Sequence, residues 1–188
     1  MEAHNYVMKK FGHPVKELSH IKNLAGKGAW MMMQKSFKQK INDEEIKKKM
    51  TNEFINYYGR NINKGSKLIK GIVEFLEWSK LKNISLAVCT NKQENLAIDL
   101  LKKLKIANYF EYIAGCNTFN FNKPDPRHLT NVIEILGGDL KKTIMVGDSE
   151  VDAVSAENAK LPFVLIEGGY TEKSTKEIKH DLLIKDFI

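Results

Sequence analysis

The spacing of hydrophobic positions changes near residue 64. Before this point apolar residues recur only at helical intervals, which predicts helices over residues 2–11, 15–23 and 42–58. Asn42 followed by Glu45 predicts a capping box at the start of the third helix, and Gly59 predicts its end. The apolar stretch of Trp30–Met33 and Phe37 fits a helical core better than a cofactor site.

Beyond residue 64, short apolar runs alternate with helical patterns. The runs predict strands over residues 84–89, 112–114, 143–146 and 163–166. The patterns between them predict helices over 68–82, from Leu96 to Leu104, from Leu129 to Leu136, and over 149–160. This alternation is typical of the α/β class, with a mostly parallel sheet covered by helices on both faces. The polar segment Asn61–Ser66 is a hinge candidate, so we expect a helical domain over 1–64 and an α/β domain over 65–188.

Composition narrows the choice of partner and compartment. The 188 residues carry a net charge of +7, but only Arg60 and Arg127 among the 30 basic residues are arginines. The lysines are spread along the chain, so we expect no nucleic-acid partner. No apolar run reaches the length of a membrane span, so we expect no membrane partner. Cys89 and Cys116 lack CxxC spacing, which favours a reducing, cytoplasmic location. We expect the chain to be a monomer or a homodimer.

Polar and charged residues follow the predicted strands, where ligands bind in parallel sheets. Thr90 and Asn91 follow one strand, Lys123 lies in a loop, and Asp148 and Asp152 follow another strand. A hydroxyl and an ammonium group suit phosphate oxygens, and paired carboxylates suit Mg²⁺. Each residue also has an ordinary explanation, as a helix cap, a surface lysine or a turn residue. Their joint occurrence favours a phosphate site.

Three segments carry a family resemblance over nearly the whole chain: "VCTNK", "FNKPDP" and "MVGDSEVDAVSAENA". They resemble the haloacid dehalogenase superfamily, in its phosphoglycolate-phosphatase-like branch. The resemblance implies a Rossmann-like core with a helical cap, which "HNYVMKKFGHP" and "LAGKGAW" would supply. It also implies a Mg²⁺-dependent phosphoric monoester hydrolase that cleaves a small phosphorylated substrate through an aspartyl-phosphate.

The same resemblance implies a role for each site residue. Thr90 and Lys123 would be catalytic, and Asp148 and Asp152 would hold Mg²⁺. Asn91 and Lys27 would bind substrate, with Lys27 in the cap loop Gly26–Gly28. For this loop, a glycine turn that carries a solvated lysine is an equally good interpretation.

The family's first motif, Asp-x-Asp-Gly-Thr, is not found in the 188 residues. It supplies the nucleophile and a central strand, so we expect unpaired backbone between two neighbouring strands. We interpret the chain as truncated and without phosphatase activity; a non-catalytic homologue that binds phosphate or a protein partner is the alternative. A receiver-type signalling domain is disfavoured because strand 84–89 ends in Cys89 and Thr90, where an aspartate would be needed.

Overall fold

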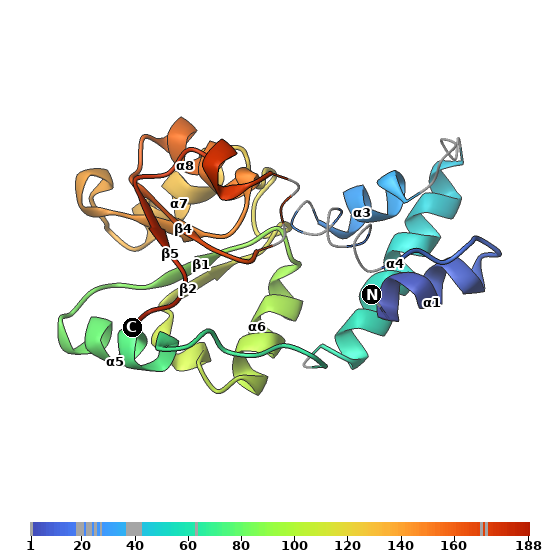
Figure 1. Cartoon of the computed structure of the whole chain (residues 1–188), viewed down its shortest axis with the longest axis horizontal. Helices are drawn as coiled ribbons and strands as arrows, with labels where there is room; N and C mark the ends of the chain where they lie inside the picture. The colour runs from blue at the N-terminus through green and yellow to red at the C-terminus, as the bar shows by residue number, and fades with distance from the viewer. Residues whose placement is uncertain are drawn as a thin grey trace. The chain divides into compact units, whose positions relative to one another are not determined.

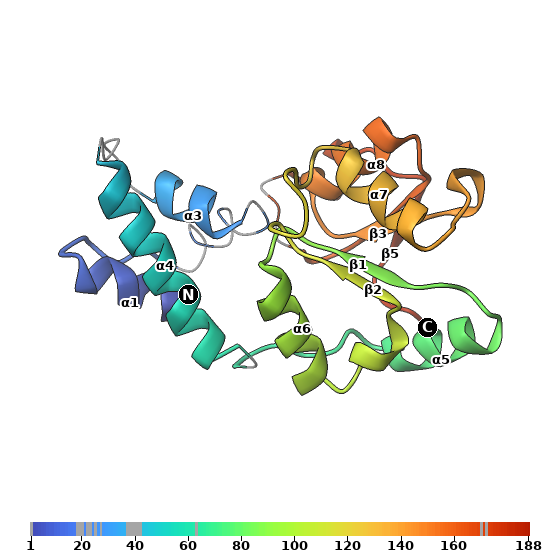
Figure 2. The same ribbon diagram turned by 180° about the vertical axis from the view of Figure 1, so that it is seen from behind.

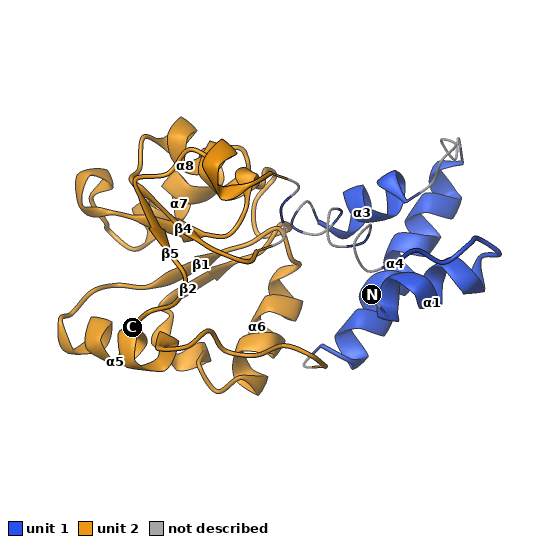
Figure 3. Cartoon of the chain, in the orientation of Figure 1, with its two compact units in different colours: residues 1–62, 170–172 blue, residues 63–169, 173–188 orange. Residues whose placement is uncertain are grey.

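The computed structural model describes residues 2–17, 21, 24, 26, 28–36, 43–62, 64–169, 171 and 173–188. These residues belong to two compact units, Met1–Ile62 with Tyr170–Glu172, and Asn63–Gly169 with Lys173–Ile188 (Figure 3). The described part of the first unit is helical or irregular, and all described strands lie in the second.

The first unit contains the helices α1 (Glu2–Lys10), α3 (Ala29–Lys35) and α4 (Glu44–Arg60). Both α1 and α3 pack against α4. The core they share consists of Val7, Met8, Met33 and Met50, all at most 1% exposed. From the predicted core stretch, Met33 is buried, but Trp30 and Met31 are each 38% exposed. Phe37 lies outside the described residues.

The start and end of α4 differ from the prediction. Its cap is Asp43 rather than Asn42: the Asp43 carboxylate accepts hydrogen bonds from the main-chain N–H groups of Glu45 and Ile46. A carboxylate at this position satisfies N–H groups that have no partner within the helix. The helix also continues through Gly59 to Arg60, so the predicted stop was wrong. A glycine weakens a helix by only about 1 kcal/mol, which packing can offset.

The predicted helix over 15–23 is wrong in its first part, because residues 15–17 are not helical. The Asn5 side chain holds this segment through the main chain of Lys16. Its Nδ2 donates to Lys16 O at 2.8 Å, and its Oδ1 accepts from Lys16 N at 2.9 Å. This pair of bonds occupies main-chain groups that a helix would use.

In the described part of the second unit, five strands form two separate sheets, each of them parallel. One sheet pairs β1 (Ala87–Cys89) with β2 (Tyr112–Ala114). The other has the order β3 (Met145–Gly147), β4 (Phe163–Ile166) and β5 (Leu182–Ile184). Among the described residues, no backbone hydrogen bond joins β1 to β3. The α/β class with parallel strands is therefore confirmed, and β5 was not predicted.

Helices flank these strands on two sides. α7 (Arg127–Ile135) and α8 (Glu150–Ala159) lie on one side, and α5 (Ile72–Leu81) and α6 (Glu94–Lys103) on the other (Figures 1 and 2). A core of Leu129, Ala156, Phe163 and Leu165 links α7, α8 and β4, and both Cys89 of β1 and Met145 of β3 pack against it. Both sheets thus share one core. No helix in the described ranges has the length and apolar character needed to span a membrane.

Candidate phosphate and metal site

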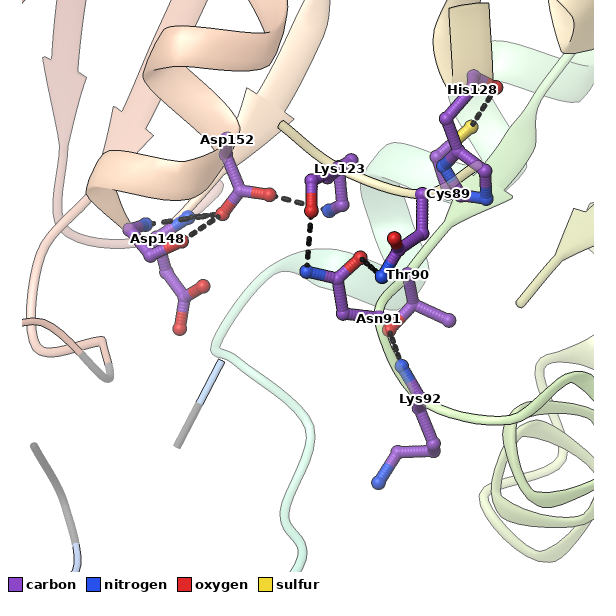
Figure 4. Close-up of polar contacts among 10 residues, drawn as sticks. Cys89, Thr90, Asn91, Lys92, Lys123, His128, Asp148 and Asp152 are labelled. Carbon is purple, nitrogen blue, oxygen red and sulfur yellow. Dashed lines mark hydrogen bonds and ion pairs between the residues drawn. The ribbon is translucent and has the colours of Figure 1, made fainter. Parts of the chain in front are cut away.

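A buried ion pair lies at the centre of the candidate site. The Lys123 ammonium lies 2.5 Å from Asp152 Oδ1, and the two side chains are only 9% and 7% exposed. Lys123 precedes α7, whereas Asp152 lies in the first turn of α8. The pair therefore joins the loop before α7 to the helix that follows β3 (Figure 4). Burying either charge alone would be costly, so each residue makes the other's burial possible.

The second oxygen of Asp152 caps α8. Oδ2 accepts from Asp148 N, Ser149 N and the Ser149 hydroxyl at 3.2, 3.1 and 2.7 Å. Ser149 and Asp152 thus form a capping box, which the Ser-x-x-Asp spacing could have predicted. Burial alone would raise the pKa of Asp152, but the Lys123 charge and the Ser149 hydrogen bond lower it overall. Asp152 is therefore ionised at neutral pH.

The close approach of Asp152 to the main chain of residue 147 explains why a glycine precedes Asp148. A Cβ on Gly147 would lie 2.5 Å from Asp152 Cβ and 2.6 Å from Asp152 Cγ. A side chain at residue 147 would consequently displace the carboxylate that pairs with Lys123.

The loop after β1 reaches the same ion pair. Asn91 Nδ2 donates to Lys123 O at 3.0 Å, and Asn122 Nδ2 donates to Asn91 Oδ1 at 3.3 Å. The Thr90 hydroxyl oxygen accepts from Lys92 N at 3.1 Å, which leaves its proton as a donor for a ligand. These contacts bring Asn91, Lys123, Asp152 and Asp148 together in one network, with Thr90 next to it (Figure 4).

Asp148 is half-buried, and its carboxylate points away from the Lys123–Asp152 pair (Figure 4). Both oxygens of Asp152 are engaged with protein groups, Oδ1 with Lys123 and Oδ2 with Ser149. In the described part of the chain, no cluster of three or more His, Cys, Asp or Glu side chains could hold a metal ion. One carboxylate still fits Mg²⁺, which keeps several waters and takes phosphate oxygens as ligands.

Two further side chains near the site are unsuited to act as nucleophile or base. Burial raises the pKa of Cys89 to about 11, so its thiol is protonated at neutral pH. His128 is fully buried, and its Nε2 lies 3.0 Å from Gly115 O. Burial lowers the pKa of His128, which keeps the imidazole neutral. Sequence patterns alone did not reveal His128, whereas Lys27, a predicted substrate ligand, lies outside the described residues.

Comparisons with known proteins agree with this architecture. The family model of haloacid dehalogenase-like hydrolases matches residues 1–166. The phosphoglycolate phosphatase of Agrobacterium fabrum is 38% identical over 174 residues, which cover 91% of this chain and 73% of the relative. That of Mesorhizobium japonicum is also 38% identical, over 71% of this chain and 59% of the relative.

A solved structure shows the same fold. The crystal structure of a predicted phosphoglycolate phosphatase from Haemophilus somnus 129pt matches with a TM-score of 0.90 and 26% identity, over 99% of this chain and 86% of that one. The chain therefore belongs to the haloacid dehalogenase-like hydrolase family.

Proposed function

We propose that this chain carries the phosphate-binding and Mg²⁺-holding part of a phosphomonoesterase site. The observation that supports it best is the network from Asn91 through Lys123 and Asp152 to Asp148, at the carboxyl ends of β1 and β3. The matched relatives named phosphoglycolate phosphatase favour a small phosphorylated acid of the phosphoglycolate type as substrate. Residues 1–64 would act as the helical cap over that substrate.

Each residue has a distinct role in the proposed site. Lys123 places a positive charge next to the phosphoryl oxygens, and Asp152 fixes the position of that charge. Asn91 holds the Lys123 main chain, and Thr90 donates its hydroxyl proton to a phosphoryl oxygen. Asp148 would hold Mg²⁺, whose bound charge would neutralise the phosphoryl group, with Asp152 as a second, weaker candidate ligand.

In the proposed site, phosphoryl transfer needs a carboxylate nucleophile that these residues do not supply. Thr90 has no adjacent base among its described contacts, and the Cys89 thiol is protonated. The sequence also lacks Asp-x-Asp-Gly-Thr. We therefore expect the 188 residues alone to bind phosphate with Mg²⁺ but to turn it over at a negligible rate.

Calorimetric titration tests this proposal. Phosphoglycolate is titrated into the chain with and without Mg²⁺, and phosphate release is followed in parallel. We expect Mg²⁺-dependent binding that Asp148→Asn abolishes and that Asp139→Asn retains. Asp139 is a suitable control because its carboxylate caps a short helix before β3, at the opposite end of that strand. Binding that survives Asp148→Asn would refute the metal role. Rapid release by the wild-type chain would show that it contains a nucleophile.

A further inference from the structure

The imidazole of His128 connects the start of α7 to the end of β2. His128 is the second residue of α7 and is 0% exposed. Its Nε2 lies 3.0 Å from Gly115 O, and because a carbonyl oxygen only accepts, Nε2 is the ring nitrogen that carries the proton. The bond therefore closes the loop of residues 115–128, and this loop contains Lys123.

The other ring nitrogen shows what the imidazole adds at this position. Among the described residues, His128 Nδ1 has no hydrogen-bond partner, although it is buried. Phe119 packs edge-on against the ring, with centroids 5.8 Å apart at an interplanar angle of 81°. An apolar side chain would fill this space without burying an unpartnered nitrogen, which costs free energy. The bond from Nε2 to Gly115 O is therefore the one contribution that an apolar residue could not make.

The end of β2 binds both sides of the candidate phosphate site. Ala114 O accepts from Thr90 N at 2.9 Å, and the next carbonyl, that of Gly115, accepts from His128 Nε2. Thr90 and the loop that carries Lys123 are thus attached to successive peptide groups of one strand end. The position of the Lys123 loop relative to Thr90 consequently depends on the bond from His128.

The turn after β2 is itself fixed against α6. A Cβ on Gly115 would collide with the main chain of Glu94, the first residue of α6. Glu94 N donates to Asn117 Oδ1 at 2.9 Å, and Cys116 N donates to Lys92 O at 2.9 Å. These contacts hold the turn on the segment that leads into α6. A side chain that binds Gly115 O is therefore held by a firmly packed part of the unit.

We propose that His128 is a positioning residue for the candidate phosphate site. Its Nε2–H on Gly115 O holds the loop so that the Lys123 ammonium and the Thr90 hydroxyl face the same phosphoryl group. Because His128 is fully buried, it acts through the loop rather than on a ligand directly. The effect on phosphate affinity rests on the proposed function, whereas the effect on the loop does not.

Calorimetric titration of phosphoglycolate in the presence of Mg²⁺ tests the effect on affinity. The amide nitrogen of glutamine lies as many bonds from the main chain as the imidazole Nε2, and that of asparagine as many as Nδ1. We therefore expect His128→Gln to keep the affinity within about twofold, and His128→Asn to weaken it about fivefold to tenfold, the equivalent of one hydrogen bond. Val132→Ala is the matched control and should keep the affinity, because Val132 is 2% exposed on the same helix and its truncation weakens packing without removing the Gly115 bond.

Hydrogen exchange measured by NMR tests the effect on the loop without phosphate ester or metal. Asn91 is buried and its side-chain amide donates to Lys123 O, so the exchange of its amide protons reports on the position of the loop. We expect this exchange to be about fivefold to tenfold faster in His128→Asn and unchanged in His128→Gln and Val132→Ala. The imidazole nitrogen shifts of the wild-type chain should show a proton on Nε2 and none on Nδ1 at neutral pH.

Wild-type exchange of the Asn91 amide in His128→Asn would overturn the proposal, and so would an unchanged affinity of this variant. An equal loss of affinity in Val132→Ala or in His128→Gln would also overturn it, because the loss would then reflect packing rather than the Nε2–H. A proton on Nδ1 in the wild-type chain would have the same consequence, and this measurement needs no variant to fold. If the wild-type chain fails to bind phosphoglycolate, the proposed function is wrong, and the Asn91 exchange alone decides the role of His128.

Discussion

Replacing Lys123 by methionine would leave the Asp152 carboxylate buried without its counter-ion. The charged atoms lie 2.5 Å apart, and both side chains are more than nine-tenths buried. Methionine is a flexible, unbranched side chain that can fill the same space, so the substitution mainly removes charge. Oδ2 of Asp152 keeps its bonds from Ser149 and Asp148, whereas Oδ1 loses its donor.

The structure sets the size of the expected loss in the free energy of unfolding. Breaking a buried ion pair by removing one partner costs about 3–5 kcal/mol. Because three hydrogen bonds on Oδ2 survive, we expect the lower end of this range, about 3 kcal/mol at pH 7. The double variant Lys123→Met with Asp152→Asn contains no uncompensated charge and should recover a large part of this loss.

Urea unfolding followed by fluorescence measures this loss. Trp78 lies in α5 of the second unit and Trp30 in the first, so a Trp30→Phe background isolates the relevant unit. Lys179→Met breaks the exposed pair between Lys179 and Glu157 and serves as the control, with no resolvable loss expected. The reasoning is refuted if Lys123→Met is no more destabilising than this control, or if Asp152→Asn fails to rescue it.

Three further results are expected. Gly147→Ala should destabilise the second unit by about 1–3 kcal/mol, because its Cβ collides with Asp152, and urea unfolding should show this loss. Folding lowers the pKa of Asp152, so the ionised carboxylate stabilises the fold above the ordinary carboxyl pKa. This stabilisation disappears as the pH falls through the pKa of the folded state. Asp152→Asn should therefore reduce the loss of unfolding free energy at acidic pH. Cys89 should react with a thiol reagent more slowly than half-buried Cys116 at pH 8, because burial raises the Cys89 pKa to about 11; equal rates by mass spectrometry would contradict this.

Much of the second unit could be predicted because its local signals agree. Apolar runs of strand length alternate with helical patterns, and polar residues follow the strands. β5 was missed because its apolar run, Leu182–Ile184, is only three residues long. Such a short run is defined by pairing with β4 rather than by its own pattern.

The site residues were predictable as a group, but their mutual contacts were not. Spacing places Lys123 and Asp152 near the same end of the sheet, yet only the folded chain shows that they pair. Similarly, Asn91 was predicted to bind substrate, whereas its described contacts hold the Lys123 loop. The substrate and metal roles themselves stay predictions. In the first unit, the helix end predicted at Gly59 was wrong because tertiary packing outweighs the weak preference of glycine against helices.

The apolar side chains of Ile144 and Val146 around β3 are 61% and 38% exposed, and this exposure suggests a function for lysines that the sequence shows only as spread along the chain. Apolar strand edges can pair with other molecules and begin aggregation, and flanking charges oppose this. Lys141 and Lys142 stand directly before the β3 region, and Lys80 and Lys82 before the β1 region, all exposed. With a net charge of +7, these residues make two copies of the chain repel one another at low ionic strength. The colloidal stability of the chain should therefore depend on salt, because screening weakens the repulsion and leaves the apolar edges free to associate.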